Sequence, residues 1–339
     1  MEIFPAVDIV IPHFRRQDLL ERCLNSLAAT RYPSLKIIVV ANGGASESLS
    51  ALLNRYSNAH LLSLPENRGY AGGCNAGLQH STAEYVVFLN DDTEHDPFWL
   101  RHLVATARAD ERIAALQPKI LSLPQKRAGK KIFDYAGAAG GMLDWLGYPW
   151  CLGRTFSAIE PDKGQYDSGQ DIFWASGVAM LVRRKIALEL GGFDEDFFMQ
   201  MEEIDLSWRM KLAGYRVFSV PTAIVWHEGG ASLAVGSTEK IYYNHRNNIA
   251  MLLKNRSLSG LFWLLPLRFL LEVAAAFFYL TQFPDSLKKS VAVFRALGWN
   301  LRHLGATLQK RRTIQGSRVV AERTIFRHLP FLHSIKRQI

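Results

Sequence analysis

The sequence lacks several signatures that would assign a protein class directly. Three cysteines, Cys23, Cys74 and Cys151, occur without a C-x-x-C pair, which argues against a disulfide framework or structural zinc site and fits a reducing compartment. No G-x-x-x-x-G-K-[ST] occurs, and no G-x-G-x-x-G follows the first predicted strand, which excludes P-loop NTPases and NAD-binding proteins. The first ten residues carry no basic segment, so we expect no signal peptide.

Positive charge is concentrated near the C-terminus. The net charge is +9, yet residues 285–339 contain twelve Lys and Arg against two acidic residues, so residues 1–284 are close to neutral. Such a basic segment predicts an anionic surface as partner, either anionic lipid or nucleic acid. Because no DNA- or RNA-binding motif accompanies the charge, we favour an anionic membrane surface and expect no nucleic acid.

An apolar segment, residues 258–283, precedes the basic one. It is long enough to span a bilayer, but Pro266, Arg268 and Glu272 disfavour a simple span. Arg268 and Glu272 are four residues apart and can pair on one helix face. A helix lying in the membrane surface is favoured, and it predicts a cytoplasmic protein, peripheral on the inner face of the cell membrane. A buried helix, an oligomer contact and a true span are the alternatives.

Strands and helices alternate over most of the chain. Apolar runs predict strands at 7–12, 35–40, 61–64 and 85–89, with helices at about 18–29 and 47–56. This alternation predicts an α/β protein with a parallel, doubly wound sheet. Residues 134–170 show no periodicity, and we expect an irregular, substrate-shaping region there. The remaining predicted elements are helices at 97–109, 185–190 and 206–213, strands at 114–121, 176–184, 215–220 and 223–226, and a basic loop at 125–131.

Three polar residues follow the predicted strand from Tyr85 to Leu89. Five consecutive apolar β-formers are typical of a strand buried on both faces, and Asn90, Asp91 and Asp92 come directly after them. Polar groups at such a strand end lie in the crevice where open α/β sheets bind ligands. The two adjacent carboxylates favour a divalent cation, Mg²⁺ or Mn²⁺, which takes further ligands from substrate phosphates. The alternative is a turn and a helix N-cap.

A glycine-rich segment, residues 65–77, carries four glycines within nine residues. A loop of this kind lets backbone N–H groups approach a phosphate, with the N-terminus of the following helix behind them. The segment therefore predicts a nucleotide site. The alternative is a helix that packs closely through its glycines.

A second acidic cluster contains Glu202, Glu203 and Asp205 at the start of a predicted helix. The helix dipole favours acids in a first turn, but three carboxylates in four residues exceed what capping needs. One of them is a candidate general base if apolar neighbours at 197–199 and 201 raise its pKa. Further along, His227 ends a predicted strand beside two glycines, which is compatible with a structural histidine or a metal ligand.

Taken together, these segments resemble the family-2 glycosyltransferases with the GT-A fold. The resemblance covers about residues 7–232 and extends to about residue 255. YYNHRNN is similar to a stretch found in the bacterial rhamnosyltransferase-like branch. Each motif alone is weak, but their common order is specific. The six motifs are VDIVIP, ENRGYAGGCNAGL, LNDD, GGFDEDFFMQMEEIDLSWRMKLAGYRVFSVP, VWHEGG and YYNHRNN.

The resemblance implies an architecture and a set of residue roles. It implies a GT-A nucleotide-diphospho-sugar transferase domain over 1–235, with a Rossmann-like, mostly parallel sheet, and a helical, basic, membrane-associated region over 236–339. Asp92 and His227 would hold Mg²⁺ or Mn²⁺, and Glu203 would act as the base, with Glu202 and Asp205 as the other candidates. The donor nucleotide-sugar would lie against Pro12, Phe14, Asn42, Asn67, Gly69, Gly72, Asn75, Asn90 and Asp91.

Two positions depart from the family's pattern. Ala41 stands where the family usually has an Asp that contacts the nucleobase, so base recognition must differ, through Asn42 or the backbone. Glu202-Glu203 stands where the family usually has Glu-Asp, and the longer Glu203 can perform the same proton transfer.

The function implied by the resemblance is an inverting, metal-dependent sugar transfer in cell-surface polysaccharide synthesis, such as O-antigen synthesis. The donor would be a dTDP- or UDP-linked rhamnose or other hexose, and the acceptor a saccharide or lipid-linked saccharide. A homo-oligomer is compatible with this reading. One alternative is a non-catalytic sugar-nucleotide-binding protein with a decayed site, for which Ala41 is the hint. Another is a nucleotidyltransferase, although the expected Gly-rich, Lys/Arg-containing loop does not follow the first strand.

Overall fold

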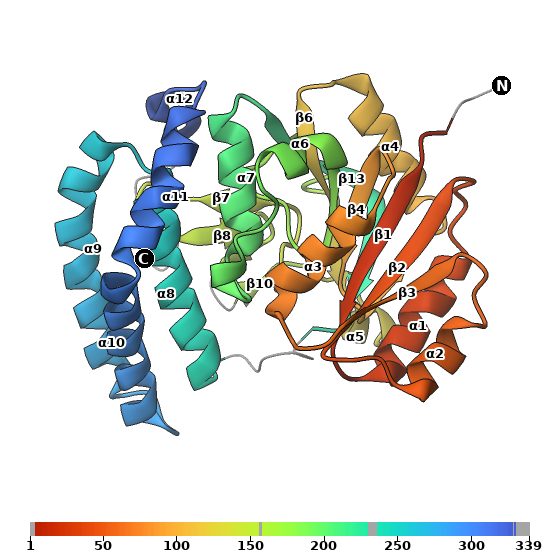
Figure 1. The fold of residues 1–339 in the computed structure, drawn as a ribbon, viewed down its shortest axis with the longest axis horizontal. Coiled ribbons are helices and arrows are strands. Elements are labelled where there is room, and N and C mark those ends of the chain that lie inside the picture. The colour runs from red at the N-terminus through yellow and green to blue at the C-terminus, as the bar shows by residue number, and fades with distance from the viewer. Residues whose placement is uncertain (1–3, 156–157, 230–235, 328, 330–339) are drawn as a thin grey trace.

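A nine-stranded mixed sheet forms the centre of the molecule in the computed structural model, which describes residues 4–155, 158–229, 236–327 and 329 (Figure 1). Its strand order is β11-β13-β6-β12-β4-β1-β2-β3, with β5 paired to β13. The strands are β1 (Val7–His13), β2 (Leu35–Asn42), β3 (Ala59–Leu64), β4 (Tyr85–Leu89), β5 (Thr93–His95), β6 (Ile113–Ser122), β11 (Gln170–Asp171), β12 (Ala179–Arg183) and β13 (Arg216–His227).

The predicted, mostly parallel sheet is confirmed. β1 pairs in parallel with β2 and β4, β2 pairs with β3, and β6 pairs with β13. β12 lies antiparallel between β4 and β6, and β5 and β11 run antiparallel to β13. The two strands predicted at 215–220 and 223–226 are one strand, β13, with an irregularity between Val220 and Ile224.

Helices cover both faces of this sheet, because alternate strand residues point to opposite sides. Ile9 and Ile11 pack with α1, α2 and α4, whereas Val10 packs with α3, α6 and α7. Each face is therefore buried, as the continuous apolar runs predict. The helices are α1 (Gln17–Ala28), α2 (Glu47–Leu53), α3 (Gly69–His80), α4 (Trp99–Ala109), α5 (Leu123–Arg127), α6 (Arg184–Glu189) and α7 (Glu202–Leu212).

The glycine-rich segment forms a helix and not the predicted phosphate-binding loop. α3 begins at Gly69 and includes the three later glycines of the segment. A Cβ on Gly77 would lie 2.2 Å from Val10 Cγ1, so this glycine lets α3 pack directly on β1. The prediction of a loop was wrong, and the alternative of a helix packed through its glycines is what the chain adopts.

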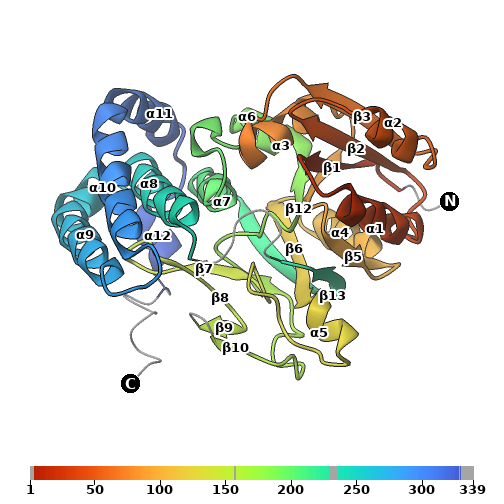
Figure 2. The ribbon, with the colours of Figure 1, turned by 90° about the horizontal axis from the view of Figure 1, so that it is seen from below.

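The region predicted to be irregular contains a second, four-stranded antiparallel sheet in the order β10-β9-β8-β7. Figure 2 shows it below the large sheet, between the α/β body and the C-terminal helices. The predicted basic loop at 125–131 overlaps the short helix α5 (Leu123–Arg127), which ends within it. The strands of the second sheet are β7 (Gly141–Leu143), β8 (Pro149–Cys151), β9 (Arg154–Thr155) and β10 (Ala158–Ile159).

Five C-terminal helices pack together beside α7 (Figures 1 and 2). They share an apolar core with the α/β body, in which the rings of Trp208 and Phe326 lie 5.4 Å apart and those of Phe173 and Trp208 lie 5.5 Å apart. This core joins residues on both sides of position 235. The helices are α8 (Thr238–Asn255), α9 (Leu258–Tyr279), α10 (Ser286–Arg302), α11 (Leu304–Gly316) and α12 (Glu322–Phe326).

Candidate active site

A cleft of about 1030 Å³ brings most of the acidic candidates together. Asn90 and Asp92 reach it from the end of β4, His227 from the end of β13, and Glu202 and Glu203 from the first turn of α7. Its other walls come from the small sheet and from α8 and α9. The cleft therefore lies at the carboxyl ends of β4 and β13, where α/β sheets bind ligands.

β5 explains why Asp92 and His227 meet although β4 and β13 are not neighbours in the sheet. Thr93 pairs with His227 across the β5–β13 ladder, and the Glu228 N–H donates to the Asp92 carbonyl at 3.0 Å. His227 Nε2 consequently lies 3.1 Å from Asp92 Oδ1 and 3.2 Å from the side-chain nitrogen of Asn90.

The other ring nitrogen of His227 is held by a residue that the sequence did not single out. His227 Nδ1 lies 3.0 Å from Asp134 Oδ1, and both side chains are buried. Burial alone would lower the pKa of His227, but the Asp92 and Asp134 carboxylates raise it to about 10. Asp134 lies in the segment without periodicity, where its neighbours in sequence gave no signal of this contact.

The Asp92–His227 pair fits a divalent cation. Asp92 Oδ1 is buried 3.1 Å from His227 Nε2, and the contact of His227 Nδ1 with Asp134 keeps Nε2 facing Asp92. A carboxylate that orients a histidine in this way is typical of metal ligation. No group of three or more His, Cys, Asp or Glu side chains suited to a metal occurs in the described part of the chain. A metal ion here would take its remaining ligands from water and substrate phosphates.

Asp91 points to a different partner. Its Oδ2 lies 2.6 Å from His13 Nδ1 at the end of β1. Burial raises the pKa of Asp91 in spite of this histidine, whereas His227 outweighs burial and lowers the pKa of Asp92. The two adjacent aspartates therefore have separate electrostatic environments.

Glu202 and Glu203 lie at the cleft, and within the described residues neither has a basic side chain at ion-pairing distance. One carboxylate oxygen of each, Oε2, is buried and makes no hydrogen bond. Burial raises the pKa of Glu203 to about 7. Burial and the neighbouring Glu203 charge raise the pKa of Glu202 well above its usual range. A carboxylate that titrates near neutral pH is suited to accept a proton from a substrate hydroxyl.

The backbone before these glutamates has an unusual conformation. Phe198, Gln200 and Met201 have φ angles of +61°, +71° and +73°, which residues other than glycine rarely adopt. On one side, the Ala71 N–H donates to the Phe198 carbonyl at 3.1 Å, and a Cβ on Gly69 would lie 2.2 Å from the same oxygen. Gly69 therefore allows α3 to pack against the loop that carries the glutamates.

On the other side, α8 holds this loop through Asn247. Its side-chain nitrogen donates to the carbonyls of Phe197, Met199 and Gln200 at 3.0, 2.8 and 2.7 Å. The neighbouring Arg246 donates to the Phe197 carbonyl at 2.8 Å. Both residues belong to the YYNHRNN motif, for which the sequence predicted no role. Through them, the C-terminal helices contact the loop that carries the predicted base.

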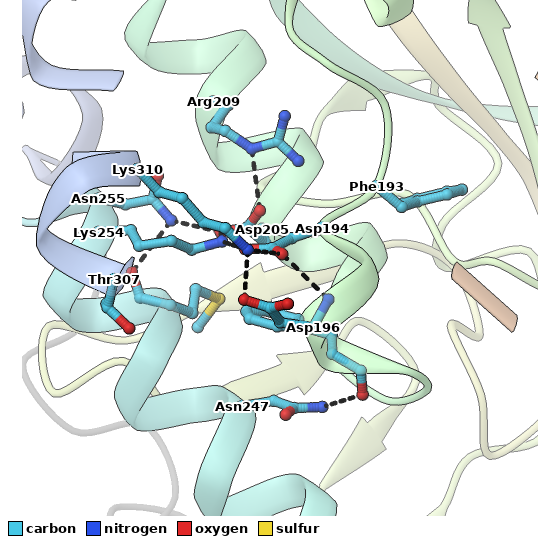
Figure 3. A network of polar contacts seen from close by, with 12 residues as sticks. Phe193, Asp194, Asp196, Asp205, Arg209, Asn247, Lys254, Asn255, Thr307 and Lys310 are labelled. Carbon is cyan, nitrogen blue, oxygen red and sulfur yellow. Dashed lines mark hydrogen bonds and ion pairs between the residues drawn. The ribbon is translucent and has the colours of Figure 1, made fainter. Parts of the chain in front are cut away.

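The structure does not bring Asp205 to the cleft, so this residue is separated from Glu202 and Glu203, which line it. Asp205 is fully buried on another face of α7, where Arg209 Nε donates at 2.9 Å, Asn255 at 2.8 Å and Lys254 at 3.0 Å (Figure 3). Burial would raise the pKa of Asp205, but Lys254 and Arg209 outweigh it and lower the pKa. Because its charge is already matched, Asp205 stabilises the contact between α7 and α8.

Lys254 links this cluster to a second carboxylate. It also pairs with Asp194, which in turn pairs with Lys310 of α11, and the three side chains lie together in Figure 3. The network therefore connects the segment before α7 with two C-terminal helices.

Several residues predicted to bind the donor are engaged within the protein. Asn42 accepts from the Arg68 N–H and donates to the Gly69 carbonyl, both at 2.8 Å. Asn67 Oδ1 accepts from the Gly69 N–H at 2.9 Å. Asn75 exchanges two hydrogen bonds with the Phe193 backbone, each of 2.9 Å. These amides fix the position of α3, and both polar atoms of the Asn42 side chain take part in this contact.

The remaining predicted donor residues surround the end of β1. Phe14 is half exposed, with the Arg15 guanidinium 4.6 Å from its ring centroid. Pro12 packs beneath α3, where a Cβ on Gly73 would lie 2.9 Å from it. A Cβ on Gly72 would lie 2.5 Å from Arg68 Cβ, so Gly72 serves packing within α3. Phe14 is the member of the set with an exposed surface for a ligand.

Solved structures with this fold are glycosyltransferases. GalNAc-T7 with UDP, GalNAc and Mn²⁺ matches with a TM-score of 0.58 and 16% identity, over 75% of this chain and 48% of that chain. The mannosyltransferase PcManGT from Pyrobaculum calidifontis, in complex with GDP-Man and Mn²⁺, matches with a TM-score of 0.52 and 17% identity, over 93% and 84%. The fold is therefore the GT-A glycosyltransferase fold, as the sequence predicts.

The family model described as Glycosyl transferase family 2 matches residues 8–190, and the chain belongs to this family. It is 29% identical over 245 residues to the O-antigen biosynthesis protein RfbC of Myxococcus xanthus, covering 70% of this chain but only 18% of that protein. It is 27% identical over 313 residues to an N-acetylglucosaminyl-diphospho-decaprenol L-rhamnosyltransferase of Mycobacterium tuberculosis, covering 85% and 95%. The predicted likeness to the rhamnosyltransferase-like branch is thereby confirmed.

Proposed function

We propose that the protein is an inverting, metal-dependent glycosyltransferase that moves a hexose, such as rhamnose, from a dTDP- or UDP-linked donor to a saccharide or lipid-linked acceptor. The observation that carries this proposal is the composition of one cleft. It combines Glu202 and Glu203, each with a buried carboxylate oxygen that makes no hydrogen bond, with the Asp92–His227 pair at the sheet edge. Similarity to a rhamnosyltransferase that acts on a lipid-diphosphate acceptor supports the substrate classes.

Each side chain has a distinct task in this reaction. Glu203 accepts the proton of the acceptor hydroxyl as that oxygen attacks the anomeric carbon, and its pKa of about 7 leaves a useful carboxylate fraction at neutral pH. Burial and the Glu203 charge also raise the pKa of Glu202, which favours the protonated form of this neighbour. A single displacement inverts the anomeric configuration and needs no glycosyl-enzyme intermediate.

Asp92 and His227 would hold the divalent ion, and Asp134 would keep His227 oriented toward it. When bound, such an ion supplies charge stabilisation to the departing nucleoside diphosphate. Phe14, exposed at the end of β1, offers a flat surface for the nucleobase.

We also propose that the protein docks on an anionic membrane surface through α9 and α10. In the described part of the chain, α9 is long and apolar enough to cross a membrane by length and composition alone. The guanidinium of Arg268 lies 2.6 Å from the Glu272 carboxylate, and this pair faces the protein interior, where Glu272 is only 1% exposed. Phe262, on the outer side of the same helix, is 87% exposed. A helix that buries its charged residues and exposes its apolar residues is suited to contact with lipid. Other exposed apolar residues of α9 and α10 are Leu258, Trp263, Phe269, Leu270, Phe277, Phe278, Leu287, Val291, Phe294 and Leu301.

Basic residues adjoin this apolar face and favour anionic lipid. Lys288 and Lys289 lie in the first turn of α10, beside the exposed Leu287. Such an arrangement predicts a peripheral protein at the cytoplasmic face of the membrane, where a lipid-linked acceptor would be available.

Nucleotide release from a panel of nucleotide-sugars, with Mn²⁺, Mg²⁺ or EDTA, tests the proposed function. We expect metal-dependent release of a nucleoside diphosphate from one dTDP- or UDP-sugar. With inorganic diphosphate added to the same panel, formation of a nucleoside triphosphate and a sugar 1-phosphate would instead indicate a nucleotidyltransferase. Donor binding without turnover in the presence of saccharide and lipid-linked acceptors would indicate a binding protein.

A further inference from the structure

One wall of the cleft carries two cations around a single aromatic ring. Arg154 of β9 and Lys240 of α8 both approach Tyr135, with Arg154 Cζ 4.0 Å and Lys240 Nζ 5.5 Å from the ring centroid. All three residues line the cleft. Two like charges on one ring repel each other, and an anion bound between them would offset that repulsion.

A third cation lines the same wall from α9. Arg268 is buried and stacks over Tyr148, with Cζ 3.9 Å from the ring centroid. It donates to Glu272 at 2.6 Å and to the Leu146 carbonyl at 2.9 Å, but its Nε has no hydrogen-bond partner. Glu272 also contacts His245, so Arg268 and His245 share one carboxylate.

Lys240 is less compensated than Arg268. Within the described ranges, the Lys240 ammonium has no carboxylate at ion-pairing distance, and it lies over the Tyr135 ring. Converging Arg and Lys side chains are the groups that bind phosphate oxygens through charge-assisted hydrogen bonds.

We propose that Arg154, Lys240 and Arg268 form a subsite for the diphosphate of a lipid-linked acceptor. This inference rests on the proposed function. The donor diphosphate belongs at the Asp92–His227 end of the cleft, where a metal would hold it. The three cations instead come from the small sheet and from α8 and α9, and α9 turns its apolar face outward.

The position of α9 gives a physical reason to assign this diphosphate to the acceptor. The same helix presents Arg268 to the cleft and Phe269 to the outside. A polyprenyl chain lying along the outer face of α9 would leave its diphosphate near the cation wall and its sugar near Glu203. Binding involves ion pairing only, and no bond is formed or broken at this subsite.

Farnesyl diphosphate is a suitable probe, because it carries a diphosphate and a short prenyl chain without a sugar. Trp150 and Trp174 line the cleft and provide a fluorescence signal for binding to the full-length protein. The variants are K240M and R154M, with K185M as the matched control, since Lys185 of α6 is 89% exposed and lies outside the cleft. Farnesol tests the contribution of the prenyl chain, and UDP with Mn²⁺ tests the donor end.

We expect K240M and R154M each to weaken farnesyl diphosphate binding by roughly 10-fold, the effect of losing one charge-assisted hydrogen bond. Farnesol binding, UDP binding and the K185M variant should be unchanged. Unchanged farnesyl diphosphate affinity in K240M would overturn the inference, as would an equal loss of UDP affinity, which would place the cations in the donor site. Donor turnover by the unmodified protein is measured separately, so its absence would count against the proposed function and not against this subsite.

Discussion

Asn247 of α8 donates a hydrogen bond of 2.7 Å to the carbonyl of Gln200, two residues before the glutamate pair. It also binds the carbonyls of Phe197 and Met199. The C-terminal helices therefore hold the backbone that carries Glu203, in a conformation with positive φ angles that the local sequence would not adopt readily.

The N247A variant should lose both stability and catalytic rate. Three hydrogen bonds would be lost, at about 1 kcal/mol each, although the Phe197 carbonyl keeps its bond from Arg246. We expect kcat to fall roughly 10–100-fold because the base is displaced. KM for the donor should change little. N300A is the matched control, since Asn300 is also buried and bonds the Arg246 carbonyl at 3.0 Å. Thermal unfolding and steady-state kinetics would measure both effects, and equal kcat losses in the two variants would refute a positioning role for Asn247.

Stability should depend on pH through Glu203. Its pKa is raised from 4.5 to about 7 in the folded protein, so the folded state keeps a proton that the unfolded chain releases. The resulting stabilisation is fully present below about pH 4.5 and is lost as pH rises through about 7. The difference is on the order of 3 kcal/mol.

E203Q cannot ionise at this position, so its stability should decline less between pH 5 and 8 than that of the unmodified protein. Urea unfolding at several pH values would measure the difference. The carboxylates of Asp194 and Asp205, whose pKa values are lowered, act in the opposite direction, since their contribution is lost as pH falls. Parallel stability curves for E203Q and the unmodified protein would show that Glu203 is not a buried acid of raised pKa.

D92N should abolish metal-dependent turnover while leaving the fold intact, because it removes a ligand charge but little volume. D134N should be milder, raising the Mn²⁺ concentration needed for half-maximal turnover by roughly 10–100-fold, the usual effect of losing a carboxylate that orients a metal-bound histidine. D18N, at an exposed position on α1, serves as the control. Normal turnover of D92N in excess Mn²⁺ would contradict the assignment of Asp92 as a ligand.

Replacing outward-facing residues of α9 should release the protein from membranes without unfolding it. Phe269 and Phe277 are 57% and 63% exposed, so F269D/F277D should abolish co-sedimentation with anionic vesicles at low salt. The control is F98D, at a 41% exposed position next to α4. Because the basic residues contribute a salt-screened attraction, binding of the unmodified protein should weaken with salt.

The vesicle experiment also separates the alternatives for α9. Unmodified protein that stays in the supernatant with anionic vesicles at low salt would contradict membrane docking. Protein that resists both high salt and alkaline carbonate would indicate a membrane span.

The sequence predicted the elements whose pattern is local. The apolar run Tyr85–Leu89 predicted β4, and the polar residues directly after it predicted the position of Asp92. Both predictions depend only on residues that are consecutive in the sequence. The i, i+4 spacing of Arg268 and Glu272 likewise predicted their ion pair, in which nitrogen and oxygen lie 2.6 Å apart.

Features that depend on distant contacts were missed. The glycines from Gly69 to Gly77 have the composition of a loop, and only packing against Val10 and Phe198 explains why they form a helix. Asp134 meets His227 from 93 positions away. Glu203 and Asp205 have the same local signals. Their difference arises from α8, where Lys254 pairs with Asp205 and Asn255 donates a hydrogen bond to it.

Transfer of sugar by E203Q, measured across pH with the donor identified in the nucleotide-sugar panel, tests the central claim most directly. The rate of the unmodified protein should rise as pH increases through about 7, because the carboxylate is the active form of Glu203. E203Q should be slower by roughly 10²–10⁴-fold, the usual contribution of a general base, with unchanged donor affinity and without this pH dependence. E203Q that transfers sugar at a near-normal rate, with D205N or E202Q the more damaging change in the folded protein, would contradict the account.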